Sequence, residues 1–176
     1  MWLKGGRSMG PSVLVGVFAL VAIEYVASGG RFTAGPPADP NFSAQLVRGP
    51  CYGSCPSYSV TVDAAGAVRF VGEKSGAGRR APCQGERRWR ISANAVAALE
   101  ARVDASGFFG LQRAYRAHMT DMPTFTVTIT RRGRTKTVTD YVGLSVGMPQ
   151  AMVDLENAID EAANDRACVA QPPPRS

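Results

Sequence analysis

The chain has 176 residues, of which 45% are hydrophobic, and a formal net charge of +6. This length is enough for one domain with a full apolar core, and the modest positive charge favours solubility without identifying a partner. With one histidine and four cysteines, the chain lacks the two close Cys/His pairs that are typical of a structural zinc site, so we predict no metal.

The N-terminal segment has the pattern of a secretory signal peptide. Lys4 and Arg7 form a basic start, an uncharged apolar run follows, and small residues lead to Ser28 as the last residue removed. A helix that spans a membrane needs about 20 apolar residues. The apolar run is shorter than that, and Glu24 interrupts it. We therefore predict export to the periplasm or the cell exterior. The alternative is an uncleaved anchor in the inner membrane, formed by residues 12–27.

Two segments without hydrophobic periodicity flank the expected domain. Residues 29–41 are rich in Gly, Pro and Ala, and we predict that they form a flexible linker. The proline-rich residues 170–176 are predicted to be a disordered tail. A single domain is therefore expected over residues 42–169, after the signal peptide at 1–28.

The first half of this domain alternates like β-strands. Residues 45–48 form a short candidate strand, and residues 58–63 alternate apolar and polar side chains with the period of a half-buried strand. A turn containing glycine then leads to a return strand at 67–74. Residues 87–91 are predicted to be a further strand.

The period then changes to that of a helix. Ser92 can cap a helix over residues 94–106, and Gly107 stands where a helix typically ends. The predicted apolar stripe of this helix consists of Val96, Leu99 and Val103.

A second hairpin and a final helix complete the pattern. Residues 124–130 alternate threonine with apolar side chains, a turn centres on Arg132-Gly133, and residues 135–142 return, so that Val127 faces Val138, Thr128 faces Thr137 and Thr126 faces Thr139. We expect the threonine face to be exposed or lightly covered. The last helix begins near Pro149. Its predicted buried stripe is Met152, Leu155, Ile159 and Ala162, and its predicted solvent face is Asp154, Glu156, Asp160 and Glu161.

The elements occur in the order strands, helix, β-hairpin, helix. Every strand connection is a hairpin or passes over one helix, so neighbouring strands should run mainly antiparallel. The sequence therefore predicts an α+β fold in which two helices pack on one face of a mainly antiparallel sheet.

Two short motifs in this pattern are distinctive. They are CYGSCPSY at residues 51–58 and TDMP at residues 120–123. They match the Cys-Tyr/Phe-Gly-x-Cys-Pro-x-Tyr opening and the Thr-Asp-x-Pro element of a family of exported bacterial domains of unknown function, which the chain resembles over residues 44–163. Cys83 and Cys168 lie outside the family pattern. The resemblance supports the predicted fold and export, and it implies no activity.

The cysteines are predicted to form disulfides, because four cysteines in an exported chain favour them, although four allow three pairings. Cys51 and Cys55 would lie about 13 Å apart in an extended strand, so a bond between them needs a turn, which Gly53 permits. We favour this pair as a loop that fastens the start of the sheet, which leaves Cys83 to pair with Cys168. The alternatives are free thiols, a catalytic redox pair, or a bond from the first two cysteines to the other two.

An enzyme is the less favoured hypothesis. A thiol-disulfide protein would use Cys51 and Cys55, but its usual motif is Cys-x-x-Cys near a βαβ unit. A hydrolase would use His118 and Asp121 with a nucleophile, and no serine of this chain lies in a Gly-x-Ser-x-Gly elbow. We therefore assign no catalytic residue and no cofactor.

The candidate binding residues are Asp121, Asp140 and Tyr141. They form a site only if the fold brings them together with His118 in one cleft. Asp121 has a simpler role available, because its carboxylate can hold the backbone where the strand after Pro123 begins.

Arginines cluster at residues 79–80, 87–90 and 131–134, mostly near predicted hairpin tips. We interpret them as a solvated basic rim, with contact to anionic lipid or cell-wall polymers as the alternative. Nucleic acid is not expected, because proteins that bind single strands interleave stacking aromatics with their basic residues.

The predicted function is a non-enzymatic, exported binding or envelope-associated domain held by disulfides. Its partner would be a cell-envelope component, and it would contact the membrane only if the N-terminal segment stays uncleaved.

Overall fold

The computed structural model describes residues 39–53, 55–73 and 83–169. The predicted signal peptide, most of the predicted linker and the predicted tail lie outside these residues. None of the helices in the described residues is both long enough and apolar enough to cross a membrane.

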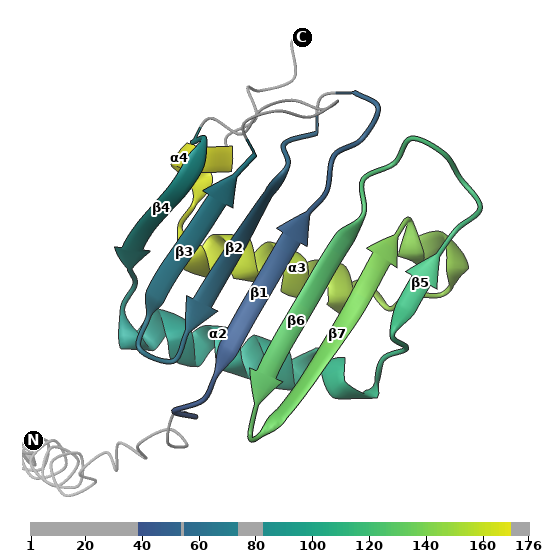
Figure 1. The fold of residues 1–176 in the computed structure, drawn as a ribbon. Coiled ribbons are helices and arrows are strands. Elements are labelled where there is room, and N and C mark those ends of the chain that lie inside the picture. Colours follow the sequence, from purple (N-terminus) through teal and green to yellow (C-terminus); the bar gives the residue numbers. More distant parts are fainter. Residues whose placement is uncertain (1–38, 54, 74–82, 170–176) are drawn as a thin grey trace, which may run out of the picture. The chain divides into compact units, whose positions relative to one another are not determined.

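The described residues form one sheet of seven strands in the order β4-β3-β2-β1-β6-β7-β5 (Figure 1). All neighbours are antiparallel except β5 and β7, which are parallel. The strands are β1 (Ser43–Arg48), β2 (Tyr58–Asp63), β3 (Ala67–Gly72), β4 (Gly85–Arg90), β5 (Ala114–Arg116), β6 (Phe125–Arg131) and β7 (Arg134–Tyr141).

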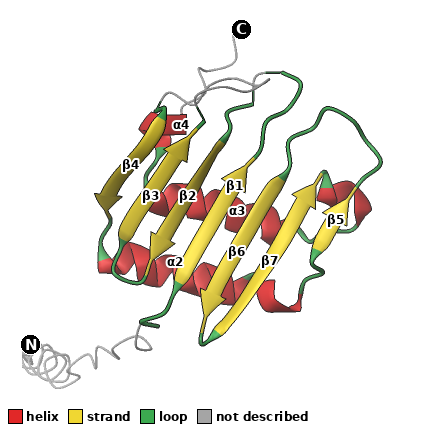
Figure 2. Ribbon diagram, viewed as in Figure 1, coloured by secondary structure: helices red, strands yellow, loops and turns green. Residues whose placement is uncertain are grey.

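Helices cover one face of this sheet, behind the strands in the view of Figure 2. The predicted α+β arrangement, a mainly antiparallel sheet with helices, is confirmed. The helices are α2 (Ala93–Ala105), α3 (Gln150–Ala163) and the short α4 (Arg166–Val169), with 3-10 turns at η1 (Phe108–Gly110) and η2 (Gly143–Val146).

The ends of α2 follow its sequence. The Ser92 side chain accepts a hydrogen bond from the Ala95 amide, and Gly107 follows the helix with a left-handed φ of 63°. The predicted stripe of Val96, Leu99 and Val103 is buried.

The buried stripe of α3 differs from the prediction. Glu156 is only 1% exposed and Asp160 is half-buried, so their assignment to the solvent face is wrong. Ala163 is buried in place of Ala162, which is half-buried. The reason is spacing: Glu156 lies four residues after Met152, on the same helical face, and the sheet is broad enough to cover that wider stripe.

The register of the second hairpin is as predicted. Val127 lies opposite Val138, and threonines lie opposite each other at three positions of β6 and β7. Arg132 and Gly133 both have left-handed φ values, of 50° and 71°, as a two-residue type I′ turn requires. The three threonine pairs are Thr126 with Thr139, Thr128 with Thr137, and Thr130 with Thr135.

These threonines lie on the face of the sheet that no helix covers within the described ranges, called the bare face below (Figure 2). Their side chains are half-buried or exposed, as expected. The same alternation places Arg131 on the helix side, where it is only 6% exposed and pairs with Glu100 and Asp104 of α2 at 2.7 and 2.8 Å. Arg131 is therefore not part of a solvated basic rim.

The second disulfide fastens the last helices to the edge of the sheet. Cys83, just before β4, is bonded to Cys168 of α4, with a Cα–Cα distance of 4.6 Å. Close by in the sequence, the Trp89 indole N–H donates to the Ala163 carbonyl at 2.7 Å. The end of α3 is thus held to β4 by a hydrogen bond, and α4 is held to the residue before β4 by a covalent bond.

Replacing Gly143 with alanine is expected to lower the free energy of unfolding by about 1–3 kcal/mol, because the site is already filled. An added Cβ would lie 2.7 Å from Asp140 Oδ1 and 2.8 Å from Tyr115 Cβ. Urea unfolding would measure the loss. Gly110→Ala is the control, since no atom lies within 4 Å of its Cβ position. Equal stabilities for the two variants would contradict this account.

Candidate functional site

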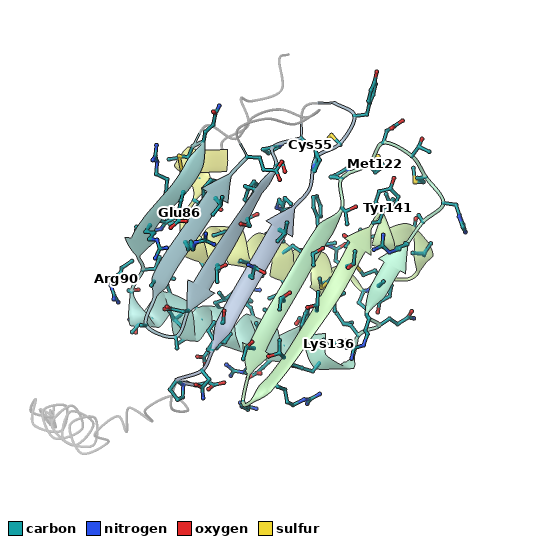
Figure 3. All side chains as sticks on the ribbon, in the orientation of Figure 1. Cys55, Glu86, Arg90, Met122, Lys136 and Tyr141 are labelled. Atoms are coloured by element: carbon teal, nitrogen blue, oxygen red, sulfur yellow. A yellow bond between two sulfur atoms is a disulfide. The ribbon has the colours of Figure 1, made fainter. Side chains whose placement is uncertain are left out.

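Three connecting segments meet at one end of the sheet. β1 and β7 end there, and β2 and β6 begin there, because Arg48 pairs with Tyr58 and Phe125, and Phe125 pairs with Asp140. Figure 3 shows Cys55, Met122 and Tyr141 near this end. The segments that carry the sequence motifs, 51–58 and 120–123, are therefore neighbours in space.

Hydrogen bonds tie these segments together. The Gly49 amide donates to the Thr124 carbonyl at 2.8 Å, and the Tyr52 amide donates to the Asp121 carbonyl at 3.2 Å. Cys51 and Cys55 are joined by a disulfide with a Cα–Cα distance of 5.6 Å, and the Gly53 amide closes the turn by donating to the Cys51 carbonyl at 2.8 Å. The disulfide loop is thus part of a cross-linked rim.

A cleft of about 440 Å³ opens beside this rim. One part of its wall is apolar and rigid, with two prolines, the Phe125 ring and the Cys55 side of the disulfide. The other part is polar and joins β1, β2 and α3. The lining residues are Arg48, Cys55, Pro56, Tyr58, Pro123, Phe125, Asn157 and Asp160.

The polar wall is centred on an ion pair between Arg48 and Asp160. Arg48 donates from Nε and Nη2 to Asp160 Oδ2 at 2.9 and 2.7 Å, and the Tyr58 hydroxyl donates to the same oxygen at 3.1 Å. The two charged side chains are only 15% and 18% exposed. The guanidinium also lies 4.5 Å from the centre of the Phe125 ring. These contacts hold Arg48 rigidly, because they engage both its charge and its planar face.

More carboxyl groups lie behind the ion pair. Glu156 and Asp165 are each 1% exposed, and Asp140 is 6% exposed. Burial, reinforced by the charge of Asp140, raises the pKa of Glu156 to about 8, against the opposing effect of Arg48. Burial and the neighbouring Asp160 also raise the pKa of Asp165. Glu156 therefore keeps its proton at neutral pH, which limits the repulsion between buried carboxylates.

These raised pKa values predict that the protein is more stable at pH 5 than at pH 8. The unfolded chain releases the Glu156 proton near pH 4.5, whereas the folded chain keeps it to about pH 8. Between these values the folded state binds more protons, so stability falls as pH rises, by about 1 kcal/mol per pH unit. Urea unfolding at several pH values would measure this slope.

Glu156→Gln is expected to reduce the slope and to leave the contribution of Asp165. Glu161→Gln, at an exposed position of the same helix, is the matched control. If the dependence of stability on pH is unchanged in Glu156→Gln, the raised pKa does not belong to Glu156.

Of the residues singled out from the sequence, Cys55 lines this cleft, whereas the candidate binding residues Asp121, Asp140 and Tyr141 do not. Asp140 and Tyr141 are consecutive in β7, so their side chains point to opposite faces of the sheet. Asp140 Oδ1 accepts from the Gly143 amide at 2.6 Å, while the Tyr141 hydroxyl donates to the Met119 carbonyl at 2.9 Å. Each therefore orders the backbone at the end of β7.

His118 and Asp121 are exposed in the segment before β6. Asp121 has a left-handed φ of 65°, and its contact with the disulfide loop runs through its main-chain carbonyl. Neither residue lines the described cleft. Among the described residues, no group of three or more His, Cys, Asp or Glu side chains is arranged to hold a metal ion.

The residues that form the polar wall were not predicted as site residues from the sequence. One signal was present: Ala44, Leu46 and Arg48 alternate, which places Arg48 on the buried face of β1. A charged residue on a buried face needs a partner, so this pattern indicates that an acidic side chain packs against Arg48.

Comparison with known proteins gives a family and no activity. A family model described as "Domain of unknown function (DUF6438)" matches residues 43–163. No curated protein matches the chain. The matched range runs from the start of β1 to the end of α3, so it contains every residue that lines the cleft.

Proposed function

The chain belongs to DUF6438, a family of domains of unknown function, and because that family assigns no activity, we propose a function from the cleft. The protein is a non-enzymatic binding domain that is exported and associates with the cell envelope. The observation that carries this proposal is the preformed cleft, in which a rigid ion pair faces an apolar wall. A few fixed polar groups in an apolar frame are typical of binding sites.

The polar wall favours binding over catalysis. Asp160 Oδ2 already accepts three hydrogen bonds, from Arg48 and Tyr58, so it is poorly placed to remove a proton. The Tyr58 hydroxyl is also held in its protonated form, because burial and the charge of Asp160 raise its pKa. The exposed Asn157 amide and the guanidinium edge are suited to a ligand with polar groups beside an apolar one.

The two disulfides support the export part of the proposal. Disulfides persist in oxidising compartments, and the described residues contain no free cysteine. The measurement is the intact mass of protein recovered from an envelope fraction. A mass lacking residues 1–28 is expected, and a mass retaining them would indicate the anchor alternative.

The cleft is tested by co-sedimentation with insoluble bacterial peptidoglycan. Asn157→Trp fills the cleft from an exposed position of α3. It removes the 3.4 Å hydrogen bond from Arg48 Nη2 to Asn157 Oδ1 and keeps both partners of the shorter Arg48–Asp160 ion pair. Asp154→Trp adds the same side chain at another exposed position of α3, outside the cleft. We expect wild type and Asp154→Trp to sediment with the polymer, and Asn157→Trp to stay in solution. Equal behaviour of the two variants would contradict the proposed site.

A thiol-disulfide protein is the second candidate, because Cys55 itself lines the cleft. This alternative predicts that the native protein reduces insulin disulfides in the presence of a thiol reductant. It also predicts that Cys51→Ser/Cys55→Ser abolishes this activity. A structural loop predicts no activity in either protein, and no thiol in the unreduced, denatured chain.

A further inference from the structure

The bare face of the sheet has a hollow of about 550 Å³ at its β4 edge, away from the cleft. We call it the arginine hollow and define it by its side chains on that face. Figure 3 shows Arg90, with Glu86, along β4. The side chains on that face are those of Thr61, Asp63, Ala67, Arg69, Arg88 and Arg90. Val68 and Trp89 also line the hollow, but strand alternation directs their side chains to the helix-covered face.

The arginines are arranged at a cost to the fold. Arg69 on β3 lies directly opposite Arg88 on β4, and like charges in that position are destabilising. Both bind the single carboxylate of Glu86, and their side chains remain 50% and 72% exposed. Arg90 adds a third exposed charge on the same face, and its guanidinium contacts the Ala65 carbonyl at 3.0 Å. Against these three arginines the same face carries two carboxylates, those of Glu86 and Asp63, so one positive charge remains in excess. This excess charge is complementary to an anionic ligand.

The hollow continues as a straight row of polar side chains. Arg69 lies opposite Thr61, which lies opposite Gln45, and the row runs on through Thr128 to Thr137. Gln45 donates to the Thr61 hydroxyl at 3.3 Å, and the two threonine hydroxyls of β6 and β7 lie 2.9 Å apart. From Arg88 to Thr137 the row crosses six strands, about 24 Å at the usual strand spacing. We call it the polar row.

The side chains of the polar row limit which class of ligand can bind there. It contains no aromatic side chain on which a base could stack, which argues against a single-stranded nucleic acid. It contains no large apolar side chain that could enter a bilayer. Hydroxyl and amide groups in a line, ending in arginines, match an extended polymer that carries both hydroxyls and carboxylates. We propose that the bare face binds an acidic polysaccharide, with its carboxylates in the arginine hollow and its hydroxyls along the polar row.

The probe for this proposal is polygalacturonate, a uronic acid polymer, with neutral dextran as the uncharged comparison. Binding is measured by calorimetry at physiological salt. We expect polygalacturonate to bind and dextran not to bind. Arg69→Gln/Arg88→Gln should weaken binding at least about tenfold through the loss of two charge-assisted contacts. Arg102→Gln/Arg113→Gln removes the same charge at exposed positions outside the hollow and should bind like wild type.

Two further variants test the row and separate this site from the cleft. Thr128→Val/Thr137→Val keeps the shape and charge but removes the hydroxyls, and it should weaken binding about threefold or more. Asn157→Trp should bind polygalacturonate like wild type, because its side chain lies in the cleft. All of these substitutions are at exposed or half-buried positions, so the variants should fold. Their thermal midpoints check this.

Several results would overturn the proposal. No binding of polygalacturonate is one, and an equal loss in both arginine double variants is another, since that would reflect net charge alone. Tighter binding of oligo(dT) or of phosphatidylglycerol vesicles, lost in Arg69→Gln/Arg88→Gln, would mean that the class of ligand is wrong.

Discussion

Replacing Cys168 with serine is expected to lower the thermal midpoint by roughly 15 °C under oxidising conditions and hardly at all in a reductant. The lost bond to Cys83 spans a sequence separation of 85 residues. In the chain-entropy account, a loop of that length stabilises the folded state by about 4 kcal/mol, because it restricts the unfolded chain. Calorimetry with and without dithiothreitol would measure the difference.

The control for this prediction is the other disulfide. Cys51→Ser/Cys55→Ser opens a loop with a sequence separation of only 4 residues, so its loss should be about half as large. Cys83→Ser/Cys168→Ser checks that a free Cys83 thiol does not form a new bond. Equal midpoints for this double variant and wild type under oxidising conditions would refute a stabilising role for the bridge.

Replacing Asp160 with alanine is expected to lower the free energy of unfolding by about 3–5 kcal/mol. The substitution leaves the Arg48 guanidinium buried under α3 without its main acceptor, and it leaves the Tyr58 hydroxyl without one. Urea unfolding at pH 7 would measure the loss. Asp154→Ala, at an exposed position of the same helix, is the control and should change stability little.

A double variant separates the charge effect from the loss of packing. Arg48→Met/Asp160→Leu removes both charges and fills the space with apolar side chains, so it should recover much of the stability lost in Asp160→Ala. A double variant as unstable as Asp160→Ala would mean that packing, and not the unpaired charge, dominates at this position.

Local patterns account for most of the fold that the sequence predicted. The alternation of threonine with Val127 and Ile129 determined the strand, and Arg132-Gly133 determined the turn, so the register of that hairpin followed. By contrast, β5 has only three residues and pairs in parallel with β7. No hairpin turn connects the two strands, so no local sequence signal predicts this pairing. The order of the strands was also not predictable, because it depends on pairings between distant segments.

The site was less predictable than the fold. Arg48 and Asp160 are separated by 112 positions in the sequence, and no local pattern links two residues so far apart. Glu156 and Asp160 were assigned to solvent because charged side chains are rarely buried without a partner. Here the partner of Asp160 comes from the far end of the chain, and Glu156 is accommodated by keeping its proton.

The first strand of the described domain, β1, is also the middle strand of its sheet. One side of β1 pairs with β2, the next strand along the chain, while the other side pairs with β6, which follows only after three further strands and α2. Pairings over such a distance raise the contact order and slow folding. Until β6 has been synthesised, β1 exposes an open edge that can pair with another copy of the chain. We therefore expect closure of the sheet at its centre to limit the folding rate, and chains truncated before β6 to aggregate.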